Sequence, residues 1–130
     1  RLIDDAEAKT AGNTGLNLIV AFNYGGKAEL TEAARAIARA VKRGELDPED
    51  ITEETIAASL YTSGIPDPDL IIRTSGEQRI SNFLLWQAAY SELVFVEEHW
   101  PDFNEETFVR VLEAYALRDR RFGGIEARIT

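Results

Sequence analysis

Two arginines and a serine within nine residues are the part of this sequence best suited to chemistry. Arg73, Arg79 and Ser81 lie in a polar stretch between an apolar run at 70–72 and a second one at 83–86. A guanidinium presents a rigid fork of N–H donors that matches phosphate oxygens, and a serine hydroxyl adds another donor. These three residues therefore predict a site for a phosphate or a diphosphate.

The elements around these residues determine where such a site would lie. Residues 70–72 are typical of a buried strand, so Arg73 emerges at its carboxyl end, the edge where open parallel sheets bind ligands. A helix is expected from about 82 to 90, capped by Ser81 or Asn82. Its free N–H groups and positive dipole end would then add to the two guanidinium groups.

Alternating strand and helix patterns predict an α/β fold, with a parallel sheet flanked by helices. Nearly continuous apolar residues are typical of strands that are covered on both faces. The expected strands cover 16–22, 70–73 and 93–96. The expected helices cover 30–41, with Gly44 as its stop, 52–60, 82–90, and a last helix from an Asn104 cap to Gly123 and Gly124.

Three strands make an incomplete parallel sheet, because both outer strands would expose unpaired edges. The sequence contains no methionine, and its first residues follow the pattern of a helix already under way. We therefore expect residues 1–130 to form the C-terminal part of a single domain. The missing strands should come from upstream residues.

Composition and charge restrict the possible partners. The chain carries a net charge of −9 and is 45% apolar, which predicts a folded protein without nonspecific affinity for nucleic acid or anionic membranes. It has no cysteine, and no apolar run reaches the 18 residues of a membrane span. A cytoplasmic location is expected, and any anion site must be a local arginine cluster.

Four motifs in order resemble the cis-prenyltransferases, and most of all the bacterial undecaprenyl (isoprenyl) diphosphate synthases. They are DLIIRTSGEQRISNFLLWQ at 69–87, AYSELVF at 89–95, WPDF at 100–103 and RRFGG at 120–124. The match runs from about residue 16 to residue 124. It covers the second half of the family's catalytic domain, so the fold is expected to be incomplete without the N-terminal half.

The resemblance implies an enzyme, a Mg²⁺-dependent transferase that condenses isopentenyl diphosphate onto an allylic diphosphate, usually farnesyl diphosphate. The new double bonds form in cis, and the polyprenyl diphosphate product carries cell-wall precursors. A homodimer is also implied, with peripheral membrane contact through the lipid product.

The resemblance also assigns roles to residues. Those matching Arg73, Arg79, Ile80 and Ser81 bind isopentenyl diphosphate, and the residue matching Glu92 helps to hold Mg²⁺. Residues like Arg121 and Gly123 reach the active site across a dimer contact. No catalytic residue is assigned in this half.

Two departures from the family pattern have consequences. The family's N-terminal aspartate, which binds metal and phosphate, has no counterpart, so the chain alone is expected to be inactive. Gln78 stands where some relatives carry histidine, and its amide lacks a titratable imidazole.

Other interpretations remain open at this point. Arg73 could form an ordinary salt bridge with Asp67, Asp69 or Glu77, and an arginine such as Arg121 could neutralise a helix C-terminus. The chain could belong to a noncatalytic scaffold subunit of a cis-prenyltransferase complex, or to a phosphate-binding α/β domain of unrelated chemistry.

Overall fold

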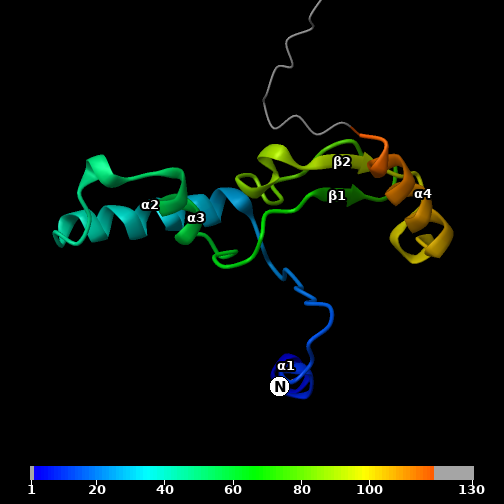
Figure 1. Cartoon of the computed structure of the whole chain (residues 1–130), viewed down its shortest axis with the longest axis horizontal. Coiled ribbons are helices and arrows are strands. Elements are labelled where there is room, and N and C mark those ends of the chain that lie inside the picture. Colours follow the sequence, from blue (N-terminus) through cyan, green and yellow to red (C-terminus); the bar gives the residue numbers. More distant parts are fainter. Residues whose placement is uncertain (1, 119–130) are drawn as a thin grey trace, which may run out of the picture.

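The computed structural model describes residues 2–118 of the chain (Figure 1). Its helices are α1 (Leu2–Thr10), α2 (Gly26–Lys42), α3 (Glu53–Ala58) and α4 (Glu105–Ala116). Its strands are β1 (Leu70–Arg73) and β2 (Glu92–Phe95). Short 3₁₀ turns cover Pro48–Asp50, Gln87–Tyr90 and Trp100–Asp102.

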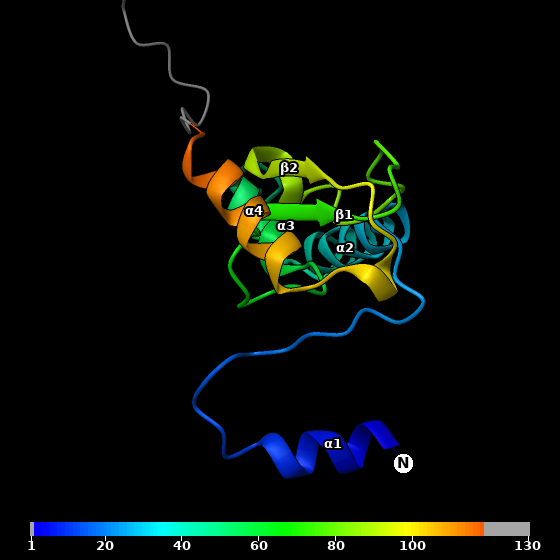
Figure 2. The ribbon, with the colours of Figure 1, turned by 90° about the vertical axis from the view of Figure 1, so that its right-hand side faces the viewer.

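The two strands form a parallel pair in register from Leu70 opposite Glu92 to Arg73 opposite Phe95. Paired residues point to the same face and successive residues alternate, so Arg73 and Phe95 share a face that excludes Glu92. Helix α4 packs beside β2, with Val111 only 2% exposed (Figure 2). The predicted strand at 70–73 is confirmed as β1. The strand predicted at 93–96 is β2, and it begins and ends one residue earlier than predicted.

Capping residues explain where the predicted helices begin. Thr52 and Thr55 form a reciprocal capping box that starts α3. The Asn104 side chain accepts a hydrogen bond of 3.0 Å from the Thr107 N–H at the start of α4. Helix α2 ends at Lys42, and Gly44 follows with a φ of +73° that favours glycine. The stop signal predicted at Gly44 is therefore confirmed.

The strand predicted at 16–22 is wrong for the described residues. This segment is extended but unpaired, and Leu16 is 91% exposed. Figure 2 shows α1 and the segment after it lying apart from the rest of the fold. An apolar run signals a preference for burial, but a strand also needs a neighbouring backbone to bond, and residues 2–118 do not provide one here.

The helix predicted at 82–90 is also wrong. Only Gln87–Tyr90 forms a 3₁₀ turn, while Ser81, Asn82 and Leu84 have positive φ values of 47°, 65° and 46°. Within the apolar run at 83–86, Leu85 instead packs against Gly26 at the start of α2, and the Phe83 ring contacts the Tyr24 ring. Ser81 and Asn82 therefore do not cap a helix of their own.

The last helix is shorter than predicted. Helix α4 ends at Ala116, and Arg118 turns away to pair with Glu92. The proposed stop at Gly123 and Gly124 lies outside the described residues. Among residues 2–118, none of the helices combines the length and apolarity required to cross a bilayer.

Candidate functional site

Arg73 is the centre of the candidate site at the carboxyl end of β1. Its Nη1 donates a hydrogen bond of 2.8 Å to Ser81 Oγ and another to the backbone carbonyl of Arg79. Its Nη2 lies 3.5 Å from Glu77 Oε2, and the Arg79 guanidinium pairs with the same carboxylate oxygen. We refer to Arg73, Glu77, Arg79 and Ser81 as the arginine cluster.

The arginine cluster confirms that the predicted residues come together. Two guanidinium groups six residues apart converge on one carboxylate oxygen, so their donors are already aimed at a shared anion position. Glu77 also realises one of the salt bridges considered for Arg73. Within the described structure, the carboxylate of Glu77 thus occupies the place that a ligand anion would take.

Ser81 contributes through both functions of its hydroxyl group. Its oxygen accepts the hydrogen bond from Arg73, so its own O–H can donate to a ligand oxygen in the same position. The residue is exposed. The cluster therefore contains hydrogen-bond donors of two kinds, guanidinium and hydroxyl.

An apolar pocket of about 280 Å³ adjoins the arginine cluster. Arg73, Arg79 and Ser81 line it together with apolar side chains, which are Ile71, Ile72, Ile80, Phe83, Leu93 and Phe95. A site with guanidinium donors beside an apolar wall suits a ligand with an anionic head and a hydrocarbon tail. The predicted substrate contact Ile80 belongs to this wall.

Glu92 lies away from the arginine cluster. It occupies the amino end of β2, opposite Leu70, and its Oε2 is 3.4 Å from Arg118 Nη1. It lies three residue steps along the strand from Phe95, roughly 10 Å, and it projects from the other face of the pair. Within one chain, Glu92 and the arginine cluster therefore lie at opposite ends and on opposite faces of the strand pair.

The described residues hold no ready-made metal centre. No group of three or more His, Cys, Asp or Glu side chains within residues 2–118 could hold a metal ion. Mg²⁺ accepts one or two carboxylates when substrate phosphates complete its shell, so the carboxylate of Glu92 has suitable chemistry. The metal role of Glu92 stays a prediction. Arg121 and Gly123 lie outside the described residues.

Sequence reasoning missed the residue that anchors the loop of the cluster. The Asn82 backbone carbonyl accepts a hydrogen bond of 2.8 Å from the Gly26 N–H, and its Oδ1 accepts another of 2.8 Å from the Lys27 N–H. Asn82 caps α2 rather than a helix of its own. The sequence feature that could have indicated this contact is the pair of glycines at the start of α2, because glycines leave room for another segment to approach closely.

A buried carboxylate next to this contact was also missed. Glu29 is 1% exposed and accepts hydrogen bonds from Tyr24 Oη (2.5 Å), the Tyr61 N–H (2.9 Å) and Gln87 Nε2 (3.2 Å). Burial, followed by the hydrogen bond to Glu29, raises the pKa of Tyr24 to about 12. This network joins α2 to the segment after α3 and to the end of the loop that carries the arginine cluster. The sequence feature that could have revealed it is a glutamate, Glu29, on an otherwise apolar face of a predicted helix.

Together, these features define a class. A parallel β pair with two arginines and a serine at its carboxyl edge, beside an apolar pocket, has the chemistry that an α/β binding site for an amphiphilic anion requires.

The comparisons with known proteins specify the family. Residues 1–123 match the family described as "Putative undecaprenyl diphosphate synthase". The chain is 58% identical over 128 residues to an isoprenyl transferase of Agrobacterium fabrum, covering 98% of this chain and 52% of the relative. It is 50% identical over 121 residues to the "Ditrans,polycis-undecaprenyl-diphosphate synthase ((2E,6E)-farnesyl-diphosphate specific)" of Micrococcus luteus, covering 93% of this chain and 49% of the relative.

The comparison with solved structures agrees with these sequence matches. Lavandulyl diphosphate synthase from Lavandula x intermedia, in complex with dimethylallyl diphosphate, matches with a TM-score of 0.88 at 44% identity, over 93% of this chain and 52% of that one. The chain therefore belongs to the undecaprenyl diphosphate synthase family of prenyltransferases. It spans about half the length of the curated relatives it matches.

Proposed function

We propose that the protein condenses isopentenyl diphosphate onto an allylic diphosphate, such as farnesyl diphosphate, to make a polyprenyl diphosphate with cis double bonds. The observation that carries this proposal is the convergence of Arg73, Arg79 and Ser81 beside an apolar pocket. The names of the relatives support it, since they are isoprenyl transferases and a farnesyl-diphosphate-specific synthase. A product of this kind serves as a lipid carrier in cell-wall synthesis.

The arginine cluster acts in this reaction by binding and orientation. A carbon–carbon bond forms between the alkene of isopentenyl diphosphate and the allylic carbon, the allylic carbon–oxygen bond breaks, and a proton leaves the new intermediate. Arg73 and Arg79 hold the diphosphate of isopentenyl diphosphate, and Ser81 donates to one of its oxygens. The pocket wall then orients the short hydrocarbon, so that the alkene lies at a fixed distance from the allylic carbon with which it reacts.

The metal and the assembly belong to the same proposal. Mg²⁺, when bound, stabilises the charge that develops on the departing diphosphate. Glu92 is the carboxylate that this chain would supply to it, and its position away from the arginine cluster favours a homodimer in which it serves the partner subunit. The protein would work in the cytoplasm, with peripheral membrane contact through its product. The 130-residue chain alone is proposed to be inactive.

Replacing each arginine in the complete polypeptide tests the proposal. Arg73→Ala or Arg79→Ala should raise the Kd for isopentenyl diphosphate at least tenfold in calorimetry, because a charge-assisted hydrogen bond contributes about 1.5–3 kcal/mol. Arg110→Ala is the matched control, since Arg110 is an exposed arginine on α4 that pairs with Glu98. Unchanged affinity in both cluster variants would contradict the proposed site.

A further inference from the structure

We propose that Asn82 is a positioning residue, which holds Arg79 and Ser81 in place for the diphosphate by tying their loop to the start of α2. The inference rests on the proposed function, because the diphosphate is the ligand whose binding it explains. Asn82 does not itself contact the substrate in this proposal. It acts on binding through its neighbour Ser81.

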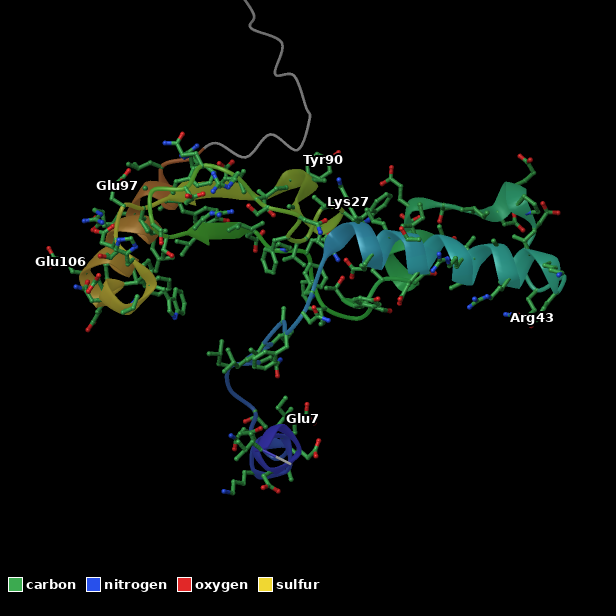
Figure 3. The ribbon with its side chains drawn as sticks, turned by 180° about the vertical axis from the view of Figure 1, so that it is seen from behind. Glu7, Lys27, Arg43, Tyr90, Glu97 and Glu106 are labelled. Atoms are coloured by element: carbon green, nitrogen blue, oxygen red, sulfur yellow. The ribbon has the colours of Figure 1, made fainter. Side chains whose placement is uncertain are left out.

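Asn82 supplies a helix cap from a distance in sequence. The first N–H groups of a helix have no partner within the helix, and here Gly25 at the N-cap position provides no side-chain acceptor. Asn82 fills that role twice, with its carbonyl on the Gly26 N–H and its Oδ1 on the Lys27 N–H, both at 2.8 Å. Figure 3 shows Lys27 at this end of α2.

Two packing contacts beside Asn82 support the same attachment. The Phe83 ring meets the Tyr24 ring edge to face, with centroids 5.6 Å apart. Leu85 packs over Gly26 so closely that a Cβ there would lie 2.8 Å from Leu85 Cγ. We call these contacts of Asn82, Phe83 and Leu85 with residues 24–27 the loop clamp.

The backbone of the loop shows why a clamp is needed. Ser81, Asn82 and Leu84 all have left-handed φ values, and such residues cost free energy unless they are glycine. A conformation of this kind persists only where surrounding contacts hold it in place. Ser81 immediately precedes the clamped residue, so loss of the clamp would release Ser81 Oγ from its position 2.8 Å from Arg73 Nη1.

Asn82→Gly in the complete polypeptide is the first test. Glycine adopts the left-handed conformation freely, so the substitution removes the capping side chain without adding backbone strain. The KM for isopentenyl diphosphate should rise about two- to tenfold, as expected for the loss of one hydrogen bond that holds the loop in place, with kcat within twofold. Asn82→Asp keeps an acceptor oxygen and should restore the KM to within threefold at high salt, where its added charge is screened.

The matched control is Asn104→Gly. Asn104 caps α4 with the same type of hydrogen bond, 3.0 Å to the Thr107 N–H, but has no contact with the arginine cluster. A general loss of stability would change both variants alike. We expect the KM of Asn104→Gly to equal that of the unaltered protein.

A second variant removes the hydrogen-bond donor of the loop clamp on α2. Lys27→Pro removes the N–H that Asn82 Oδ1 accepts and leaves the arginine loop itself unchanged, and proline is tolerated in the first helical turn. It should raise the KM by a similar factor, and the double variant Lys27→Pro/Asn82→Gly should not add to either single effect. If the KM stays unchanged in folded Asn82→Gly, or in Lys27→Pro, the positioning role is overturned. Because Arg79→Ala tests the proposed function independently, a normal KM in that variant as well would indicate that the site, and not only the clamp, is misassigned.

Discussion

The Tyr24 hydroxyl donates its hydrogen to a carboxylate that is almost wholly buried, and this pairing fixes its protonation state. Burial and Glu29 both disfavour a negative charge on the phenol, so the pKa of Tyr24 rises from 10.0 to about 12. The folded protein therefore holds this proton more tightly than the unfolded chain. The contribution to stability is complete below pH 10 and is lost as the pH rises through about 12.

Tyr24→Phe tests this assignment through the ultraviolet titration of tyrosinate. In the unaltered protein Tyr24 should ionise near pH 12, and Tyr61 should also titrate late, because its hydrogen bond to Glu32 raises its pKa. The Tyr24→Phe variant should lose the Tyr24 step, keep that of Tyr61, and lose less stability between pH 10 and pH 12. Tyr90→Phe is the control, because the Tyr90 side chain is 63% exposed. A step near pH 12 whose amplitude is unchanged in Tyr24→Phe would contradict the pKa shift of Tyr24.

The contact between α2 and the loop of the cluster is the feature that matters most among the elements. Gly26 is the first residue of α2, and Leu85 occupies the space where its side chain would lie. The glycine is required by this close approach rather than by its backbone angle. Two segments nearly sixty residues apart thus meet at one point.

Gly26→Ala should destabilise the protein by about 1–3 kcal/mol, because the new methyl group would overlap with Leu85. The midpoint of urea denaturation of the complete polypeptide measures the effect. Gly12→Ala is the control, since a Cβ at that position would meet nothing within 4 Å. A denaturation midpoint in Gly26→Ala equal to that of Gly12→Ala would show that Leu85 can move aside without cost.

Local signals predicted the elements whose formation depends on nearby residues. Thr52 and Asn104 identified the starts of α3 and α4, and the apolar run at 70–73 identified β1. The failures at 16–22 and 82–90 have a different cause, since both depend on partners distant in sequence. Apolar residues at 83–86 fit a helix by periodicity, but contacts with α2 decide their conformation instead.

The same distinction applies to the candidate site. Arg73, Arg79 and Ser81 could be grouped from the sequence because they flank one strand end within nine residues. The position of Glu92 could not be predicted from the sequence. Closeness in sequence to a strand does not reveal at which end, or on which face, of a parallel pair a residue lies. The cap supplied by Asn82 was likewise hidden, because asparagine before an apolar run has the same local signature whichever helix it caps.

At the scale of the whole molecule, the separation of Glu92 from the arginine cluster predicts cooperation between two copies. In the proposed homodimer, Glu92 of one subunit would act with the arginine cluster of the other. Arg79→Ala and Glu92→Gln homodimers should each lose activity. Mixed dimers should regain about half of the original activity per active dimer, because one of their two sites then carries neither substitution.

Co-expression of the two complete polypeptides with different purification tags isolates the mixed dimer for this measurement. A mixture of Arg79→Ala with Arg73→Ala is the control, since both substitutions fall in the same cluster and no site is restored. Activity in the mixed dimer no higher than in this control would show that Glu92 serves its own chain or has no part in the reaction.

Glu77 has a consequence for how the site turns over. Its carboxylate is shared by the Arg73 and Arg79 guanidinium groups, so the site carries its own tethered counter-ion. In the proposed reaction, an arriving diphosphate would replace this carboxylate rather than a dissolved anion, and the carboxylate would stay only a side chain's length away. When the diphosphate departs, Glu77 would return to the two arginines, which would lower the electrostatic barrier to diphosphate release. Occupancy of the proposed site would then be an exchange between two anions, one of which never leaves the protein.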